Sequence, residues 1–348
     1  MKASLARTIK KQTNKIVRTL PGYVEDFIFE NKDAKQPQTL LGYTRDITLL
    51  FDYLKYIGEI DTDDYTDVPV KTFDKLTTRD IQRFLDYLED YEKEYTTTNG
   101  KIVIQNFQNS TFGKSRKLAA IREWFNYLEE KKLIEKNVAK TVKFKVQKRG
   151  YIKERLSTEQ IKKLFTIPEE DESNKKIHAQ HVALRNVTIM KILAYSGIRV
   201  SELVQLDIDD LLLNEETMLI IRKGGKKEKI DLAPQIIEQL EKYLPYRKTL
   251  EAKTNEDKNA LFLSMQRKRP NTRSIRDMLK KAGEEAEIPF NVTPHVLRRT
   301  FGTNHYNQNQ DMYLTASVLG HSSADTTKNH YVAIDENRKR SSIKNFEY

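Results

Sequence analysis

The chain has 348 residues, enough for two domains, because single domains usually hold about 100–200 residues. Hydrophobic residues make up 38% and charged residues 32%, which suits a soluble protein with packed cores and does not suit a disordered or membrane chain. The absence of cysteine excludes disulfides, thiolate metal sites and a cysteine nucleophile. The basic N-terminus lacks the apolar stretch of a secretory signal, so we expect a cytoplasmic protein.

Lysine and arginine number 61 against 50 aspartate and glutamate residues, which gives a net charge of +11. Such an excess favours a polyanionic partner, either nucleic acid or an anionic membrane surface. No apolar run approaches the roughly 18 residues that cross a bilayer. The positions of the charges along the chain are needed to choose between these partners.

The first 150 residues predict helices, because apolar residues recur there at the spacing of one helix face. A first helix is expected from about residue 40, with Thr39 as its N-cap and Gly58 at its end. A second helix begins after Thr77, with Asp80 at its third position, and a third covers 111–131.

The opening turns of the third helix are basic. Lys114, Arg116 and Lys117 lie there, a pattern suited to contacts with DNA phosphates. A solvated basic helix end is the more common meaning of such a cluster, and this alternative stays open.

Residues 140–155 form a basic segment that we interpret as a linker between two domains. A linker that crosses DNA phosphates would account for its charge, and Lys145, Lys148 and Arg149 would then contact DNA. A lysine-rich surface loop accounts for the same pattern equally well.

The part of the chain after this linker is predicted to be mainly α-helical with a small antiparallel sheet. Ser157 and Gln160 form a capping box that opens a helix, and Gly197 closes the mostly apolar helix that follows. Two short strands are expected at 217–222 and 228–232, around a turn of glycine and lysine.

Four segments of this second domain are polar where a core would be apolar. In the first, SGIRVSEL, Arg199 lies at the mouth of a helix that Ser201 would cap, where its planar guanidinium can bind a phosphate. A surface ion pair with Glu202 explains the same arginine. The second, RKGGKK, is a turn whose glycines permit close approach to DNA and whose lysines reach phosphates, although such turns are common on soluble proteins.

The third segment, TPHVLRRT, has Thr293 as an N-cap and Pro294 as the first helical residue. His295 and Arg298 then lie on one helix face near the N-terminus, whose dipole attracts anions. A guanidinium and an imidazole directed at one anion are typical of phosphoryl transfer. A capped surface helix is the alternative.

The fourth segment, LGHSSADTTKNHY, places His321 in the turn after Gly320 and Tyr331 on the following helix. A tyrosine hydroxyl, with a pKa of about 10, becomes a useful nucleophile where cations stabilise its developing charge. Ordinary packing explains any one of the 17 tyrosines equally. The histidines form no recognisable zinc set and no nucleotide-binding loop is present, so we expect neither a metal nor a cofactor.

In this order the four segments resemble the motifs of the tyrosine recombinase (phage integrase) family. The helices before them, with TLLGYTRDITLLFDYL and STFGKSRKLAAIREWFNYL, resemble the core-binding domain of that family. The resemblance implies that Arg199 and Arg298 clamp the scissile phosphate of DNA and that His321 donates a hydrogen bond to it. Glu202 would support the first of these arginines.

The resemblance also implies the chemical step, in which Tyr331 attacks the phosphate and leaves a 3′-phosphotyrosyl bond. His295 would assist the proton transfer, and Lys223 would protonate the leaving 5′ oxygen. The turn after Lys223 is one residue longer than the common form, so Lys226 is a rival for the acid. No metal or ATP is implied, because the phosphotyrosine bond stores the energy needed for religation.

A helical DNA-binding domain is implied for 1–139, a linker for 140–155, a catalytic domain for 156–335, and a tail at 336–348 that docks onto a neighbouring protomer or is a frayed end. The fold of the N-terminal domain would begin soon after residue 20. The two domains would form a C-shaped clamp of Xer-like layout on double-stranded DNA. Four protomers would join two inverted-repeat sites through a Holliday junction, with any accessory protein unknown. Chromosome-dimer resolution and mobile-element integration or excision both use this chemistry. A non-cutting DNA-binding regulator and a type IB topoisomerase are the rivals.

Overall fold

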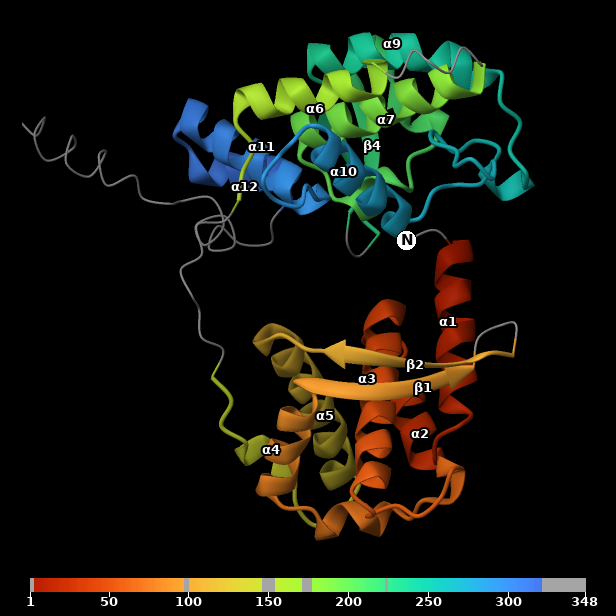
Figure 1. Ribbon diagram of the computed structural model, residues 1–348, viewed down its shortest axis with the longest axis vertical. Coiled ribbons are helices and arrows are strands. Elements are labelled where there is room, and N and C mark those ends of the chain that lie inside the picture. Colours follow the sequence, from red (N-terminus) through yellow and green to blue (C-terminus); the bar gives the residue numbers. More distant parts are fainter. Residues whose placement is uncertain (1–2, 97–99, 146–153, 171–176, 223–224, 321–348) are drawn as a thin grey trace, which may run out of the picture. The chain divides into compact units, whose positions relative to one another are not determined.

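The computed structural model describes residues 3–96, 100–145, 154–170, 177–222 and 225–320 of the chain (Figure 1). The chain divides into two compact units, which we describe separately. The N-terminal unit is Lys2–Gly150 and the C-terminal unit is Tyr151–Tyr348. Five residues singled out from the sequence lie outside the described residues, namely Lys148, Arg149, Lys223, His321 and Tyr331.

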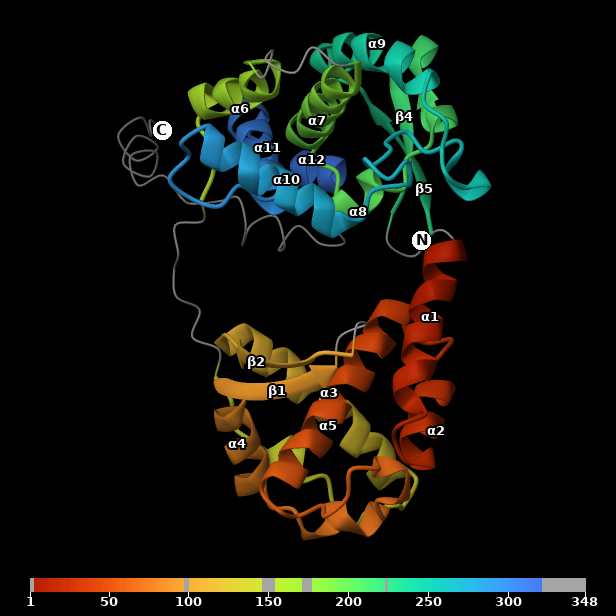
Figure 2. The same cartoon turned by 45° about the vertical axis from the view of Figure 1, so that its right-hand side comes forward.

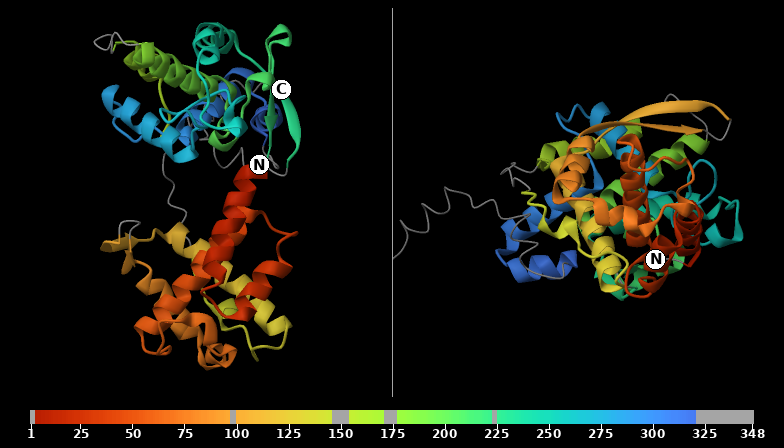
Figure 3. Two further views of the ribbon diagram at one scale, coloured as in Figure 1. Left: turned by 90° about the vertical axis from the view of Figure 1, so that its right-hand side faces the viewer. Right: turned by 90° about the horizontal axis from the view of Figure 1, so that it is seen from below.

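The N-terminal unit contains helices and one β-hairpin. Its elements are α1 (Ala3–Val17), α2 (Gly22–Glu30), α3 (Pro37–Tyr56), α4 (Thr78–Tyr87), β1 (Asp90–Thr96), β2 (Ile102–Gln108) and α5 (Thr111–Glu130), with short 3-10 turns at Tyr65–Asp67, Val70–Lys75 and Val138–Thr141. An aromatic cluster of Phe51, Phe73 and Trp124, all fully buried, lies in its core. Helix α1 packs along α3 (Figure 3) and adds Val17 to this core, so the domain already includes residues before 20.

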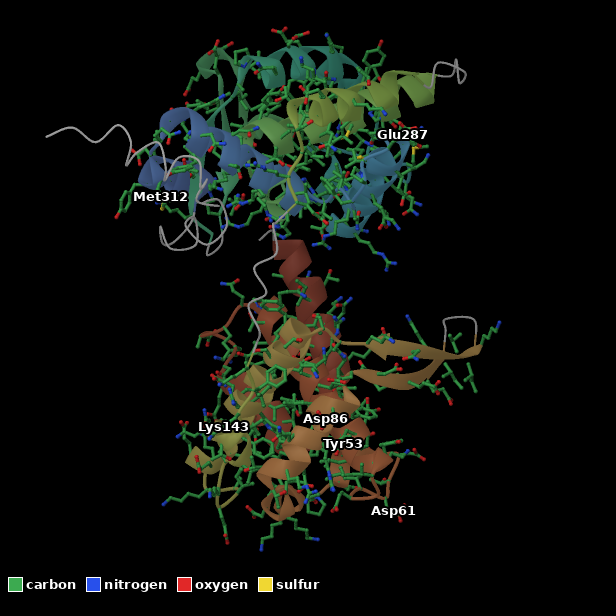
Figure 4. The ribbon with its side chains drawn as sticks, turned by 60° about the vertical axis from the view of Figure 1, so that its left-hand side comes forward. Tyr53, Asp61, Asp86, Lys143, Glu287 and Met312 are labelled. Carbon is green, nitrogen blue, oxygen red and sulfur yellow. The ribbon has the colours of Figure 1, made fainter. Side chains whose placement is uncertain are left out.

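The hairpin of β1 and β2 shows that the expectation of helices throughout the first 150 residues is wrong. On one face of the hairpin, Tyr91 packs between Tyr87 of α4 and Phe107 of β2, with ring centroids 5.3 and 5.5 Å away. Lys93 on the same strand places its Nζ 2.7 Å from a carboxylate oxygen of Asp52. The contacts of Tyr91 with Phe107 and of Lys93 with Asp52 favour strands in a segment rich in charge. Part of the hairpin extends beyond the helices of its unit (Figure 4).

The predicted helix cap is confirmed at the start of α4 and is wrong at the start of α3. Thr77 and Asp80 form a capping box, in which each side chain accepts from the other residue's backbone N–H. The N-cap of α3 is Gln36 rather than the predicted Thr39, and the helix begins at Pro37, because the fixed φ of proline suits the first helical position. Gly58, with φ of +79°, follows the end of this helix as expected.

The C-terminal unit is mainly helical. Its helices are α6 (Thr158–Glu170), α7 (Ile177–Ser196), α8 (Val200–Leu203), α9 (Pro234–Lys248), α10 (Thr272–Glu285), α11 (Pro294–Asn309) and α12 (Met312–Leu319). Its strands are β3 (Leu211–Leu212), β4 (Thr217–Ile221) and β5 (Lys227–Asp231), and 3-10 turns lie at Ile208–Asp210, Leu213–Glu215 and Asn255–Asp257. Helices α6, α9 and α11 pack against α7, and the strands form one antiparallel sheet with β4 in the middle (Figure 2).

Several local predictions for this unit are confirmed. The N–H of Gln160 donates to Ser157 Oγ (3.2 Å), and the N–H of Ser157 donates to Gln160 Oε1 (2.9 Å), which completes the capping box of α6. Strands β4 and β5 each match the predicted strand to within one residue at either end, and β3 is an addition. The fold is therefore mainly α-helical with small antiparallel sheets, as expected. Over the described ranges, we find no helix with both the length and the apolar character needed to cross a membrane.

Candidate active site

Arg199 lies at the junction of α7 and α8, where two local features set its position. Gly197 ends α7 with φ of +61°, and a Cβ there would collide with the ring of Phe301. The backbone N–H of Arg199 then donates to Glu202 Oε2 at 2.7 Å, so Arg199 is itself the N-cap of α8. The expected cap, Ser201, lies inside that helix instead, because Glu202 already satisfies the first N–H group.

Glu202 is a buried carboxylate, 3% exposed, between two arginines. Its Oε1 lies 3.0 Å from Nη1 of Arg199, and its Oε2 lies 3.2 Å from Nη1 of Arg222. A buried charge is costly unless it is paired, so Glu202 orients both guanidinium groups. The ion pair between Arg199 and Glu202 is thus present, but as part of a buried network.

Three arginines converge on the carboxyl end of α12, where helix carbonyls lack intrahelical partners. Arg298 donates to Leu319 O at 2.6 Å and also to the carbonyl of Gly197. Arg199 donates to Gly320 O at 3.2 Å, and Arg222 donates to carbonyls of the same turn. The structure therefore brings together the two arginines that the sequence predicts as a phosphate clamp, beside the negative end of a helix dipole.

His295 lies one turn before Arg298 on α11, whose N-terminus Thr293 caps by accepting from the Val296 N–H at 3.2 Å. The imidazole keeps contact with solvent. Partial burial lowers its pKa, and the charges of Arg298, Arg276, Arg299 and Arg199 lower that pKa further. A neutral imidazole near pH 7 can accept a proton.

Arg276 of α10 is a residue that the sequence interpretation missed. It is exposed, and its positive charge helps to lower the pKa of His295 although it lies on a different helix. Its sequence surroundings, TRSIRDML, are those of an ordinary amphipathic helix. No local pattern distinguishes it, because its relation to His295 arises only when α10 and α11 are folded.

The turn between β4 and β5 is described on either side of 223–224. Arg222 N–H donates to Lys226 O (2.8 Å), and Gly225 N–H donates to Arg222 O (3.0 Å). Lys226 is exposed. The predicted acid Lys223 follows Arg222 directly in the chain, and the predicted phosphate ligand His321 follows Gly320 directly. Of their described neighbours, Arg222 belongs with Arg199 and Arg298 to the arginine cluster at the end of α12, and Gly320 accepts a hydrogen bond from Arg199 of that cluster.

The basic residues of α5 have partners within the protein. Lys114, 7% exposed, forms an ion pair with Glu89, and Lys117 Nζ lies 2.8 Å from Asn109 Oδ1.

Arg116 binds both carboxylate oxygens of Asp46, at 2.6 and 2.7 Å. Burial raises the pKa of the Asp46 carboxyl, and the Arg116 guanidinium opposes that shift. The Arg116 side chain remains 54% exposed, and Lys145 is also exposed.

The chain is similar to known proteins along most of its length. Residues 154–338 match the model of the phage integrase family. Among curated proteins, tyrosine recombinase XerS of Streptococcus pneumoniae (strain CGSP14) is 27% identical over 356 residues, covering 94% of this chain and 96% of the relative.

Solved structures show the same fold. XerH site-specific recombinase bound to difH substrate before cleavage gives a TM-score of 0.61 at 20% identity, covering 93% of this chain and 84% of that one. Its post-cleavage complex with palindromic difH gives 0.64 at 18% identity, covering 94% and 95%. Lambda integrase (75–356) bound to a COC′ core site gives 0.59 at 16% identity, covering 87% and 95%. The chain belongs to the phage integrase family and is a site-specific DNA recombinase of the tyrosine type.

Proposed function

We propose that this recombinase cuts DNA by attack of the Tyr331 hydroxyl on a phosphate held by Arg199, Arg298 and His321. The observation that carries the proposal is the convergence of Arg199 and Arg298 at the end of α12. Guanidinium groups there can stabilise the charge that develops on the phosphate oxygens. The DNA partner agrees with the net charge of +11.

The proton transfers of this step balance. Tyr331 O forms a bond to phosphorus while the bond from phosphorus to the 5′ oxygen breaks. The tyrosine proton passes to neutral His295, whose lowered pKa supports this role. The 5′ oxygen takes a proton from Lys223, with Lys226 as the rival donor. Religation reverses each transfer and restores the phosphodiester.

The wider assembly is also part of the proposal. A DNA-binding domain at 1–139 and a catalytic domain at 156–335 clamp the duplex, with 140–155 crossing between them. The division of the chain into units at Gly150 and Tyr151 supports a linker in that segment. Four protomers hold two inverted-repeat sites, and 336–348 docks onto a neighbour.

Contacts with DNA come from Lys145, Lys148 and Arg149 of the linker and from the basic face of α5 in the N-terminal domain. Within that face, the exposed guanidinium of Arg116 supports a contact more than the buried ammonium of Lys114. Lys117, whose pKa burial lowers, lies between the two in exposure.

Chromosome-dimer resolution and mobile-element integration or excision remain the two candidate biological roles. The first role is the one that the Xer-like layout implies, and similarity to tyrosine recombinase XerS along 96% of that relative supports this layout. The fold shared with lambda integrase, solved on a COC′ core site, supports the second role as well.

The test is to mix the protein with fragmented host DNA, denature the mixture and sequence whatever stays covalently attached, with Tyr331→Phe as control. Adducts at one inverted-repeat site, absent in the control, are expected. A site near the replication terminus would indicate chromosome-dimer resolution, and a site at the ends of an element would indicate integration or excision. Tight binding without adducts would favour the non-cutting regulator, and adducts without sequence preference would favour topoisomerase-like activity.

A further inference from the structure

Arg222, which directly follows β4, has a buried guanidinium group whose contacts the recombination chemistry above does not use. The residue is 7% exposed. Its Nε and Nη2 lie 3.3 and 2.9 Å from the two carboxylate oxygens of Glu228 on β5. Its Nη1 reaches Glu202 Oε2 at 3.2 Å and Leu319 O at 3.4 Å, and Nη2 also reaches Val318 O at 3.2 Å.

These five hydrogen bonds match the five N–H groups of a guanidinium. They join β4 and β5, the two strands on either side of the lysine turn (222–227), to α8 and to the carboxyl end of α12. Two of the acceptors are shared, because Glu202 also binds Arg199 and Leu319 O also binds Arg298. Arg222 therefore touches the supports of both clamp arginines.

The Arg222 side chain fits beside Gly320 because glycine has no Cβ. A Cβ at that position would lie 2.6 Å from Cζ of Arg222 and 2.7 Å from its Nε. The guanidinium thus lies directly against the backbone of the residue that precedes His321. The hydrogen bond from Arg222 also lowers the pKa of the Glu228 carboxyl, which keeps this partner ionised.

We propose that Arg222 is a positioning residue that fixes the facing ends of β4 and β5 against Glu202 and the carboxyl end of α12, to which the two clamp arginines also bind. It acts on the reaction through its chain neighbour Lys223, the proposed acid, and it does not touch the DNA itself. The inference rests on the function proposed above. Misplacement of a catalytic group by about 1 Å can lower a rate about a hundredfold, so a small shift of the turn is measurable.

The variant Arg222→Lys keeps the charge and loses the planar, five-donor group. We measure single-turnover cleavage of a nicked substrate that traps the covalent intermediate, once with the natural phosphodiester and once with a 5′-bridging sulfur. Sulfur leaves without the help of an acid. On the natural substrate we expect cleavage to slow about tenfold or more. On the sulfur substrate it should stay within about threefold of the unaltered protein, with the DNA dissociation constant unchanged.

Glu228→Gln gives a second reading if Arg222→Lys does not fold, because it weakens the hold on Arg222 without altering the arginine. Its matched control is Glu215→Gln, which breaks the exposed ion pair with Lys229 on the same sheet and should cleave normally. Glu228→Gln should show the same sulfur-dependent defect as Arg222→Lys, in milder form.

Equal slowing of both substrates in the Arg222 and Glu228 variants would overturn the positioning role while leaving the proposed function intact. A loss of DNA binding that matches the loss of cleavage would also overturn it. Absence of any adduct from the unaltered protein would instead refute the proposed function.

Discussion

Replacing Gly320 by alanine should reveal how tightly the end of α12 packs on the arginine cluster. The new Cβ would meet Arg222 Cζ at 2.6 Å, and Gly320 has φ of +61°. The left-handed backbone by itself costs a side chain about 1 kcal/mol. Displacing Arg222 would disturb hydrogen bonds between buried charged groups, at roughly a further 1–3 kcal/mol. The expected loss in free energy of unfolding is therefore about 2–4 kcal/mol.

Gly225→Ala is the matched control in the same unit. Gly225 has φ of +89°, and a Cβ there meets nothing within 4 Å, so only the backbone cost of about 1 kcal/mol applies. Thermal unfolding followed by circular dichroism measures both variants. The drop in Tm for Gly320→Ala should be about two to four times that for Gly225→Ala, because small changes in Tm are proportional to the loss in free energy of unfolding. Equal drops would show that the contact between Gly320 and Arg222 contributes nothing to stability.

Three further predictions concern the reaction and DNA binding. The lowered pKa of His295 means that its neutral, proton-accepting form persists below pH 6.5, so the acid limb of the rate of adduct formation should lie below that value. Arg276→Gln removes one of the charges that lower this pKa and should move the limb upward; a limb that stays in place would show that His295 is not the base. DNA binding should weaken about a thousandfold or more between roughly 50 and 200 mM salt in a filter-binding titration, and salt-insensitive binding would contradict the clamp. Lys223→Ala should regain cleavage on a 5′-bridging sulfur substrate, and rescue of Lys226→Ala instead would transfer the acid role to Lys226.

Short-range signals in the sequence predicted helix ends and turns well. Thr77 with Asp80 and Ser157 with Gln160 form their capping boxes, since each box needs only a residue and its neighbour three positions later. Gly320 ends its helix at positive φ, because glycine adopts that conformation without a steric cost.

Contacts beyond the immediate sequence neighbours account for two of the wrong predictions, the hairpin and the cap of α8. The hairpin at 90–108 depends on Tyr91 stacking on Phe107 of the facing strand and on Lys93 reaching Asp52, which lies 41 residues earlier. At α8, the N-cap is Arg199 and not the predicted Ser201. The buried carboxylate of Glu202 accepts from the Arg199 backbone N–H and also pairs with two arginine side chains.

The sequence by itself determined the family and the candidate chemistry, because four short motifs occur in order and each is defined by residues a few positions apart. Only the tertiary structure decided how Arg199, Arg222 and Arg298 share the end of α12. Arg298 reaches the carbonyl of Gly197 across 101 positions, and Arg222 reaches Leu319 across 97. Such contacts depend on how helices and strands pack, and burial then makes each shared carboxylate and carbonyl oxygen an acceptor that the arginines must satisfy.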